Sequence, residues 1–210
     1  MENEKRRGVD LYLSQGLSVL FHPAFLPVYG LLLIFNAPTF MVHLPYDIKR
    51  IIFLMATVNM TVVPLALMPL LKYRNMITSY GMETTRERVI PLTLGVMMYT
   101  VTTIIFFTYQ IPVLIKSFML ASTVTSFIIL VITFRWKISI HSAGMGGLLA
   151  TAMALSVRMN ADLRWVVMAI IFLSGVVMAS RLYLRVHTPA QVYTGFVAGF
   201  TVFMIVMTMF

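Results

Sequence analysis

Long apolar stretches alternate with short polar junctions along almost the whole chain. Each stretch is close to the roughly 20 residues that a helix needs to cross the hydrocarbon core of a bilayer. The pattern predicts an all-α fold, a polytopic membrane bundle of about six to seven transmembrane helices. The stretches cover residues 24–41, 49–71, 89–109, 113–134, 141–157, 164–183 and 189–209.

The first of these stretches carries the weakest helix signal. Pro23, Pro27 and Pro38 interrupt it, and proline removes a backbone donor and kinks or ends a helix. A kinked or re-entrant first segment would leave six complete spans. We predict one membrane-embedded domain over residues 1–210, with an N-terminal interfacial segment at 1–21 that includes a short helix from residue 9 onward.

Composition agrees with a membrane location. The 210 residues are 60% hydrophobic and only 11% charged, with a net charge of +9 at pH 7 and a mean hydropathy of +0.90. A soluble domain could not keep so much apolar surface away from water. The excess of Lys and Arg in such a chain favours anionic membrane lipids as partners and not nucleic acid.

The sequence contains no recognisable metal-binding pattern. It has no cysteine, and His22, His43, His141 and His187 lack the spacing of a zinc motif. We therefore predict neither a metal nor another cofactor.

Small residues recur in two of the stretches. Gly144, Gly146 and Gly147 lie in one, and Gly195 and Gly199 lie in another. Glycines let the backbones of membrane helices approach closely. They predict tight packing between the fifth and the seventh helix.

Alternation of the helices places three helix starts, near residues 85, 139 and 188, on one face of the membrane. Lys and Arg are more numerous on this face. Setting aside those that could bind a substrate leaves the two faces nearly equal, so the positive-inside rule leaves the orientation open.

These three starts carry capping residues. Thr84 and Glu87 have the spacing of a capping box, and Ser139 is the expected N-cap of the next start. At the third start Thr188 is the expected N-cap, followed by Pro189 and, at the third helical position, Gln191. Each start would point unpaired backbone N–H groups at the membrane surface.

The same starts carry basic side chains, although a helix N-terminus prefers acidic ones by roughly 0.3–1 kcal/mol. Arg86, Arg88, His141 and His187 all run against this preference. A bound phosphate would reverse it, because helix N-termini and guanidinium groups both bind phosphate. The alternative is that these cations only lie beside anionic lipid head groups, as snorkelling of Arg181 from a helix end would also imply.

An anion site of this composition predicts phosphoryl transfer without a metal. Arg86, Arg88 and Arg181 could hold phosphoryl oxygens. His141 and His187 could supply a nucleophile and a general acid, because imidazole titrates near neutral pH.

The last of these segments resembles a known motif. Ser180 and Arg181, then five residues, His187, three residues and Gln191 resemble the third motif, SRx5Hx3D, of the type 2 phosphatidic acid phosphatase superfamily. Ser139, Ile140 and His141 resemble the end of its second motif, PSGH. The segment from Met82 to Pro91 stands in the place of its first motif, Kx6RP.

The resemblance implies an integral-membrane lipid phosphatase with a core of about six helices. It implies that His187 attacks phosphorus and becomes a phosphohistidine, and that His141 protonates the leaving group. Arg181, with Arg88 or Arg86, would hold the phosphate, and Ser139 would also touch it.

The chain departs from the family pattern at several positions. Gln191 replaces an Asp, and an amide can orient the histidine but supplies no charge; Gln191 also fits a role in capping alone. Ile138 and Ile140 replace the Pro and Gly of PSGH, and Gly81 or Ser79 stands where the first motif has Lys.

We predict a phosphatase of a bacterial cytoplasmic (inner) membrane that hydrolyses a lipid phosphate or pyrophosphate, such as an isoprenoid pyrophosphate or a phospholipid phosphate. A second hypothesis is a catalytically silent protein that binds lipid phosphate, and a third is a small transporter of an anionic solute. His22 is interpreted as a helix-boundary residue and His43 as an interfacial one, both outside the site.

Overall fold

The computed structural model describes residues 2–81 and 84–210, with the side chains described from Asp10 onward. Met82 and Glu83, the first two residues of the segment compared with the first motif, lie outside the described residues. The described part is helical and contains no strand, as the apolar pattern predicted. Its α-helices are α1 (Glu2–Leu20), α2 (Leu26–Asn36), α3 (Tyr46–Thr57), α4 (Val63–Tyr73), α5 (Thr85–Thr108), α6 (Val113–Thr133), α7 (Ile140–Met159), α8 (Arg164–Tyr183) and α9 (Pro189–Met209).

Six helical segments among the described residues are long and apolar enough to cross a membrane. Five of them are α5 to α9. The sixth, Tyr46–Tyr73, joins α3 and α4 through a π-helical turn, η2 (Val58–Val62). Pro64 stands two residues after the end of this turn, and its missing N–H explains why the regular hydrogen-bond ladder is interrupted there. The expectation of six complete spans is thereby met.

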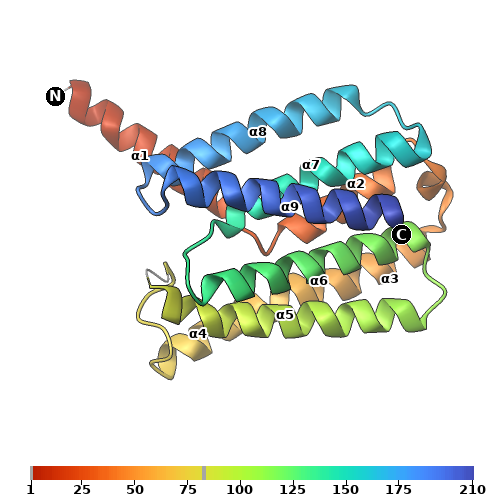
Figure 1. The fold of residues 1–210 in the computed structure, drawn as a ribbon, viewed down its shortest axis with the longest axis horizontal. Coiled ribbons are helices and arrows are strands. Elements are labelled where there is room, and N and C mark those ends of the chain that lie inside the picture. The colour runs from red at the N-terminus through yellow and green to blue at the C-terminus, as the bar shows by residue number, and fades with distance from the viewer. Residues whose placement is uncertain (1, 82–83) are drawn as a thin grey trace.

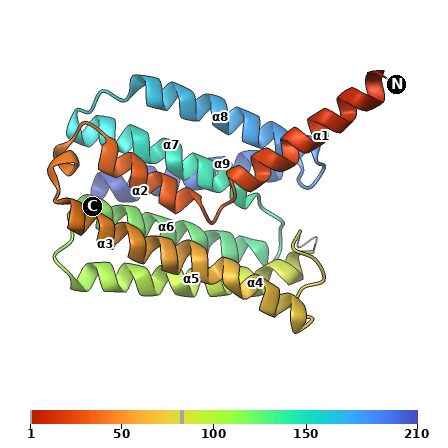
Figure 2. The same ribbon diagram turned by 180° about the vertical axis from the view of Figure 1, so that it is seen from behind.

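The first predicted stretch does not form a full span. The helix α2 has only 11 residues, about 16 Å of helix, and a 3-10 turn, η1 (Phe40–His43), follows it. The predicted helix over 24–41 was therefore too long, and α1 begins earlier than residue 9. Figure 2 shows α1 projecting beyond the end of the bundle, while α2 lies inside it beside α7. A break at residues 21–25 separates α1 from α2.

The core of the bundle is the contact between α7 and α9. A Cβ atom at Gly146 would overlap the backbone of α9 at Phe196, and one at Gly199 would overlap the Ala143 carbonyl of α7. The predicted close packing of these two helices is confirmed. Gly144 is the exception, because it faces Leu26 of α2 instead of α9.

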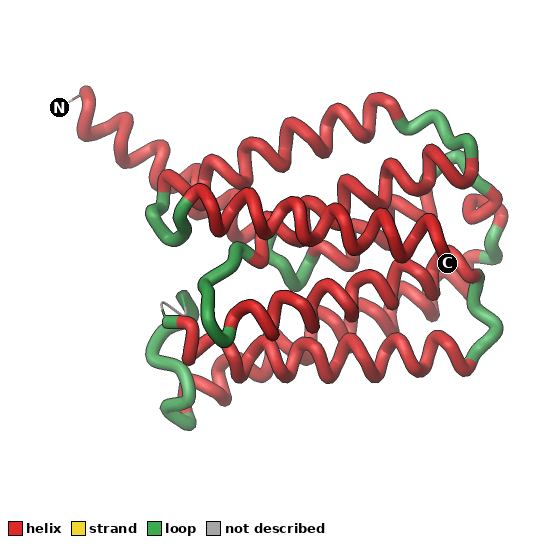
Figure 3. The backbone as a smooth tube through the Cα atoms, viewed as in Figure 1, coloured by secondary structure: helices red, strands yellow, loops and turns green. Residues whose placement is uncertain are grey.

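The starts of α5, α7 and α9 lie at one end of the bundle, together with the end of α8 (Figure 1). The loops that join these elements gather at the same end in Figure 3. The helix α1 packs against α8 there. The fold therefore brings the three basic helix starts together, as alternation predicted.

Candidate functional site

Each of the three helix starts is capped by the expected side chain. The Thr84 hydroxyl accepts the Glu87 N–H at 3.3 Å, and the Ser139 hydroxyl accepts the Ser142 N–H at 3.4 Å. At α9, Thr188 and Gln191 form a complete capping box. The predicted box at α5 is only half formed, because the Glu87 carboxylate accepts the Thr78 N–H at 3.0 Å.

His187 lies just before α9 and is 7% exposed. Its Nδ1 atom is 3.2 Å from the Lys137 carbonyl oxygen and 3.2 Å from the side-chain oxygen of Gln191. A carbonyl oxygen only accepts hydrogen bonds, so Nδ1 carries the proton of the neutral ring. Its Nε2 atom is buried and has no hydrogen-bond partner among the described residues. The ring therefore presents a free lone pair inside the protein.

The surroundings of His187 keep this ring uncharged. Burial, and next the charge of the Arg88 guanidinium, lower the pKa of His187 to about 4. At neutral pH the Nε2 lone pair is consequently available, which is the state a nucleophile needs.

Two guanidinium groups near this ring have no carboxylate partner among the described residues. Arg88, in the first turns of α5, is 6% exposed and donates from Nη1 to the Ile138 carbonyl at 3.1 Å. Arg181, near the end of α8, interacts electrostatically with Arg88 and with His187. The Nε atoms of both arginines are buried without a partner in the described part of the chain. Two such cations side by side create a strong preference for an anion.

His141, in the first turn of α7, meets the end of α1. Its Nε2 atom lies 3.2 Å from the Ser18 carbonyl oxygen, and Arg181 donates from Nη1 to the Ser18 hydroxyl at 3.0 Å. Because the Ser18 carbonyl only accepts, Nε2 of His141 carries a proton here. α1 thus holds the neutral ring of His141, which can act as an acid only after its second ring nitrogen takes up a proton.

His22 lies at a helix boundary, between α1 and α2, as its interpretation from the sequence expected, and its ring also reaches this region. Its ring stands nearly perpendicular to that of His141, at 84°, with 5.7 Å between the centroids. Burial and the charge of Arg181 lower the pKa of His22. Arg181 acts electrostatically on all the other members of what we call the histidine–arginine cluster. The cluster comprises His22, Arg88, His141, Arg181 and His187.

Other predicted residues lie outside this cluster. The Arg86 side chain is exposed, so of the two candidates on α5 only Arg88 points inward. Ser139 is fully buried, and its hydroxyl accepts from the Ser142 hydroxyl at 2.9 Å as well as from the Ser142 N–H. Ser139 therefore stabilises the start of α7 from a buried position. His43 lies in η1, at the far end of α2.

Residues that could hold a metal ion are not gathered in the cluster. Among the described residues, no group of three or more His, Asp or Glu side chains could hold an ion. The chemistry open to the cluster is that of three imidazoles and two guanidiniums acting on a bound anion.

The six apolar spans are those of an integral membrane protein, and the cluster lies at one end of them. Searches against protein-family models, curated proteins and solved structures find no match to this chain. The function has to be argued from the cluster and its surroundings.

Proposed function

We propose that the chain is a metal-independent phosphatase that hydrolyses a lipid phosphate or pyrophosphate through a phosphohistidine at His187. The observation that carries the proposal is the state of the His187 ring. Its Nδ1 is held by the Lys137 carbonyl and Gln191, while its Nε2 is buried and unpartnered beside two arginines. A free lone pair next to unpaired cations suits attack on a bound phosphoryl group.

The proposed reaction has two steps. In the first, the Nε2 lone pair of His187 forms a bond to phosphorus as the bond from phosphorus to the lipid oxygen breaks. His141, charged beforehand by a proton taken up at its second ring nitrogen, gives one proton to that oxygen and returns to the neutral ring, so the lipid product leaves neutral at that atom. In the second, a water attacks the phosphohistidine and gives a proton to His141, and the electron pair of the phosphorus–nitrogen bond returns to Nε2. Inorganic phosphate is released.

Arg88 and Arg181 would hold the phosphoryl oxygens and stabilise the charge that develops on them. The resemblance to the type 2 phosphatidic acid phosphatase motifs supports these roles, since His141, Arg181 and His187 are the positions it names. The location we propose is a bacterial cytoplasmic membrane.

Phosphate release from lipid phosphates by the purified protein, with a chelator present, tests the proposal. His187→Ala should abolish release, and His141→Ala should slow it, because both proposed steps use His141. His43→Ala, at the other end of α2, is the matched control and should retain full activity. Unchanged release in both His187→Ala and His141→Ala would reject the proposal.

A second candidate is a protein that binds lipid phosphate without turning it over. Gln191 favours it, because the amide supplies no negative charge to stabilise a charged ring at His187. The hydrogen bonds of Ser18 with His141 and with Arg181 also favour it, because they occupy N–H groups that the reaction would use. Detection of phosphate on His187 after mixing with substrate would exclude this candidate.

A further inference from the structure

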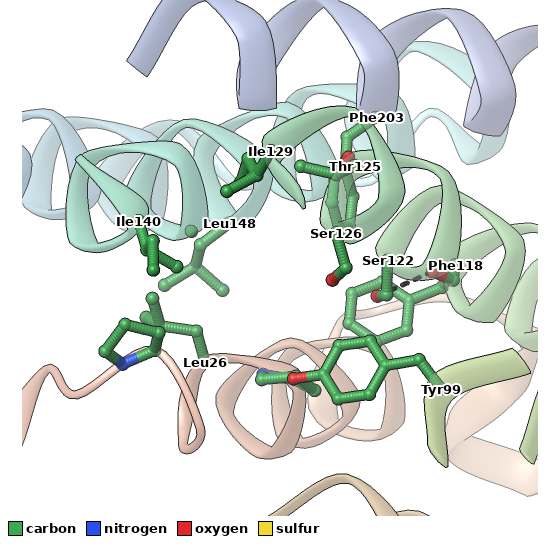
Figure 4. Close-up of a pocket in the computed structure, with 13 residues that line it drawn as sticks. Leu26, Tyr99, Phe118, Ser122, Thr125, Ser126, Ile129, Ile140, Leu148 and Phe203 are labelled. Carbon is green, nitrogen blue, oxygen red and sulfur yellow. Dashed lines mark hydrogen bonds between the residues drawn. The ribbon is translucent and has the colours of Figure 1, made fainter. Parts of the chain in front are cut away.

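A narrow pocket lies inside the bundle beside the break between α1 and α2 (Figure 4). Side chains of α2, α5, α6, α7 and α9 line it. Its volume is about 70 Å³, small beside the roughly 300–1,000 Å³ of a typical small-molecule pocket. It has room for part of one hydrocarbon chain and not for two side by side.

Two residues that line the pocket are direct sequence neighbours of residues in the histidine–arginine cluster. Pro23 and Ile140 both line it. Pro23 directly follows His22, and Ile140 directly precedes His141. A lipid whose phosphate lies at the cluster can therefore direct a chain into this pocket without leaving the bundle.

The two walls of the pocket differ in chemistry. Figure 4 shows the apolar side chains of Leu26, Ile140 and Leu148 on one side, and the hydroxyls of Tyr99 and Ser126 on the other. A wall of aliphatic carbon suits a hydrocarbon chain, which gains from leaving water or polar surroundings. The hydroxyl wall suits a ligand that also carries a hydrogen-bond acceptor.

The hydroxyls of this wall differ in their partners. The Ser122 hydroxyl is satisfied, because it donates to the Phe118 carbonyl at 2.9 Å. Thr125 is 6% exposed, and its hydroxyl is buried without a partner in the described part of the chain. Tyr99 and Ser126 are partly buried and line the pocket. Hydroxyls that face a pocket can donate to an acceptor on a bound molecule.

We propose that this pocket binds the single acyl chain of a lipid phosphate, and that the ester or amide carbonyl of the chain accepts a hydrogen bond from Ser126 or Tyr99. The inference rests on the proposed function, since the cluster is taken to hold the phosphate. It narrows the substrate class to a one-chain acyl lipid. An isoprenoid chain carries no carbonyl and would leave the hydroxyls unpaired, and a volume of about 70 Å³ leaves no room for a second chain beside the first.

The depth of Ser126 fits this arrangement. Ser126 stands two helical turns before Thr133, the last residue of α6, which is about 10 Å along the helix axis. A glycerol-sized spacer between a phosphate and an acyl carbonyl covers a length of this order. The carbonyl would therefore reach the hydroxyl wall while the phosphate stays at the helix starts.

Binding to an inactive variant tests the inference separately from turnover. In His187→Ala, a one-chain acyl lipid phosphate and its ether analogue, which lacks the carbonyl, compete with a photoactivatable one-chain acyl probe. The acyl lipid should bind roughly threefold to tenfold more tightly than the ether, the range expected for one hydrogen bond. Introducing Ser126→Ala together with Tyr99→Phe should remove the difference, and crosslinks should map to the α2 and α7 segments that line the pocket.

Ser156→Ala is the matched control, because the Ser156 hydroxyl already bonds to its own helix at the Ala152 carbonyl. It should leave the preference for the acyl lipid unchanged. Equal binding of ester and ether lipids, equal competition by a two-chain lipid, or crosslinks outside the pocket would each overturn the inference. Failure of the proposed function looks different: the acyl lipid would bind with this preference, and the unmutated protein would release no phosphate from it.

Discussion

The side-chain oxygen of Gln191 lies 3.2 Å from Nδ1 of His187 and also accepts the backbone N–H of Thr188 at 3.1 Å. One oxygen thus completes the capping box of α9 and holds the imidazole in place. The two roles considered for Gln191 from the sequence are therefore both present. The arrangement ties the orientation of the ring to the start of the helix, so a change at Gln191 affects both.

Two substitutions of Gln191 separate its effect on the orientation of the His187 ring from the effect of a negative charge at this position. Gln191→Ala should lower kcat by about 10- to 100-fold, as loss of an orienting partner commonly does, and should reduce stability by about 1 kcal/mol through loss of a capping contact. Gln191→Glu keeps the oxygen but adds a negative charge, which raises the pKa of His187. The acid limb of the pH–rate profile should then move to higher pH. An unchanged acid limb in Gln191→Glu would show that this residue does not contact the reacting ring.

The lowered pKa of His187 predicts a dependence of stability on pH. The pKa is about 4 in the folded chain against an ordinary value of 6.5, so between these values the unfolded chain binds more protons. The folded state should be favoured fully above about pH 6.5 and lose up to about 3 kcal/mol as the pH falls towards 4.

Thermal unfolding in detergent at pH 4 to 7 measures this loss. The comparison is with His187→Gln, which cannot titrate at this position and should show a correspondingly smaller decline. Parallel curves for the two proteins would contradict the prediction.

Arg88 and Arg86 provide a matched pair on the same helix. Arg88 is buried and bonds to the Ile138 carbonyl, whereas Arg86 is exposed. Arg88→Gln should lower kcat/KM by about 10²–10³, the usual effect of removing one donor to a developing oxyanion. Arg86→Gln should change it by less than about threefold, because an exposed charge is screened by solvent.

Steady-state kinetics on both variants, with a check that each elutes as a single species, compares the two positions. Equal losses in the two variants would mean that general positive charge, and not a directed contact, supports the reaction.

The packing of α7 against α9 predicts opposite effects of the same substitution at two glycines. A Cβ atom at Gly199 would overlap the Ala143 carbonyl, while one at Gly175 in α8 would meet nothing within 4 Å. Gly199→Ala should destabilise the protein by about 1–3 kcal/mol. Gly175→Ala should stabilise it by up to about 1 kcal/mol through helix propensity. The unfolding midpoints of the two variants in detergent give the answer, and a stable Gly199→Ala protein would refute the close approach of the helices.

Local signals explain why the helix starts were predictable from the sequence. Ser139 and Thr188 are N-caps whose identity and spacing are sufficient to place them. The alternation of apolar stretches then placed these starts at one end of the bundle.

The contacts of Ser18 and His22 with His141 were not predictable in this way. They join residues more than a hundred positions apart. They also depend on the packing of α1 against α8. The position of α2 inside the bundle also explains why Gly144 meets Leu26 and not α9. The Lys137 carbonyl that fixes the His187 tautomer is a backbone atom, so residue types carry no signal for it.

The helices on either side of the break at residues 21–25, α1 and α2, carry the chain along the bundle in addition to the six long spans. The six long spans alone would return the chain to its starting side. The pair α1 and α2 adds one more passage, so the beginning of α1 and the end of α9 lie at opposite ends (Figure 1). Labels attached at the two termini would therefore face different compartments, and the histidine–arginine cluster would share the compartment of the amino-terminal label. The side of the membrane that receives the released phosphate can thus be learned from the accessibility of one terminal tag.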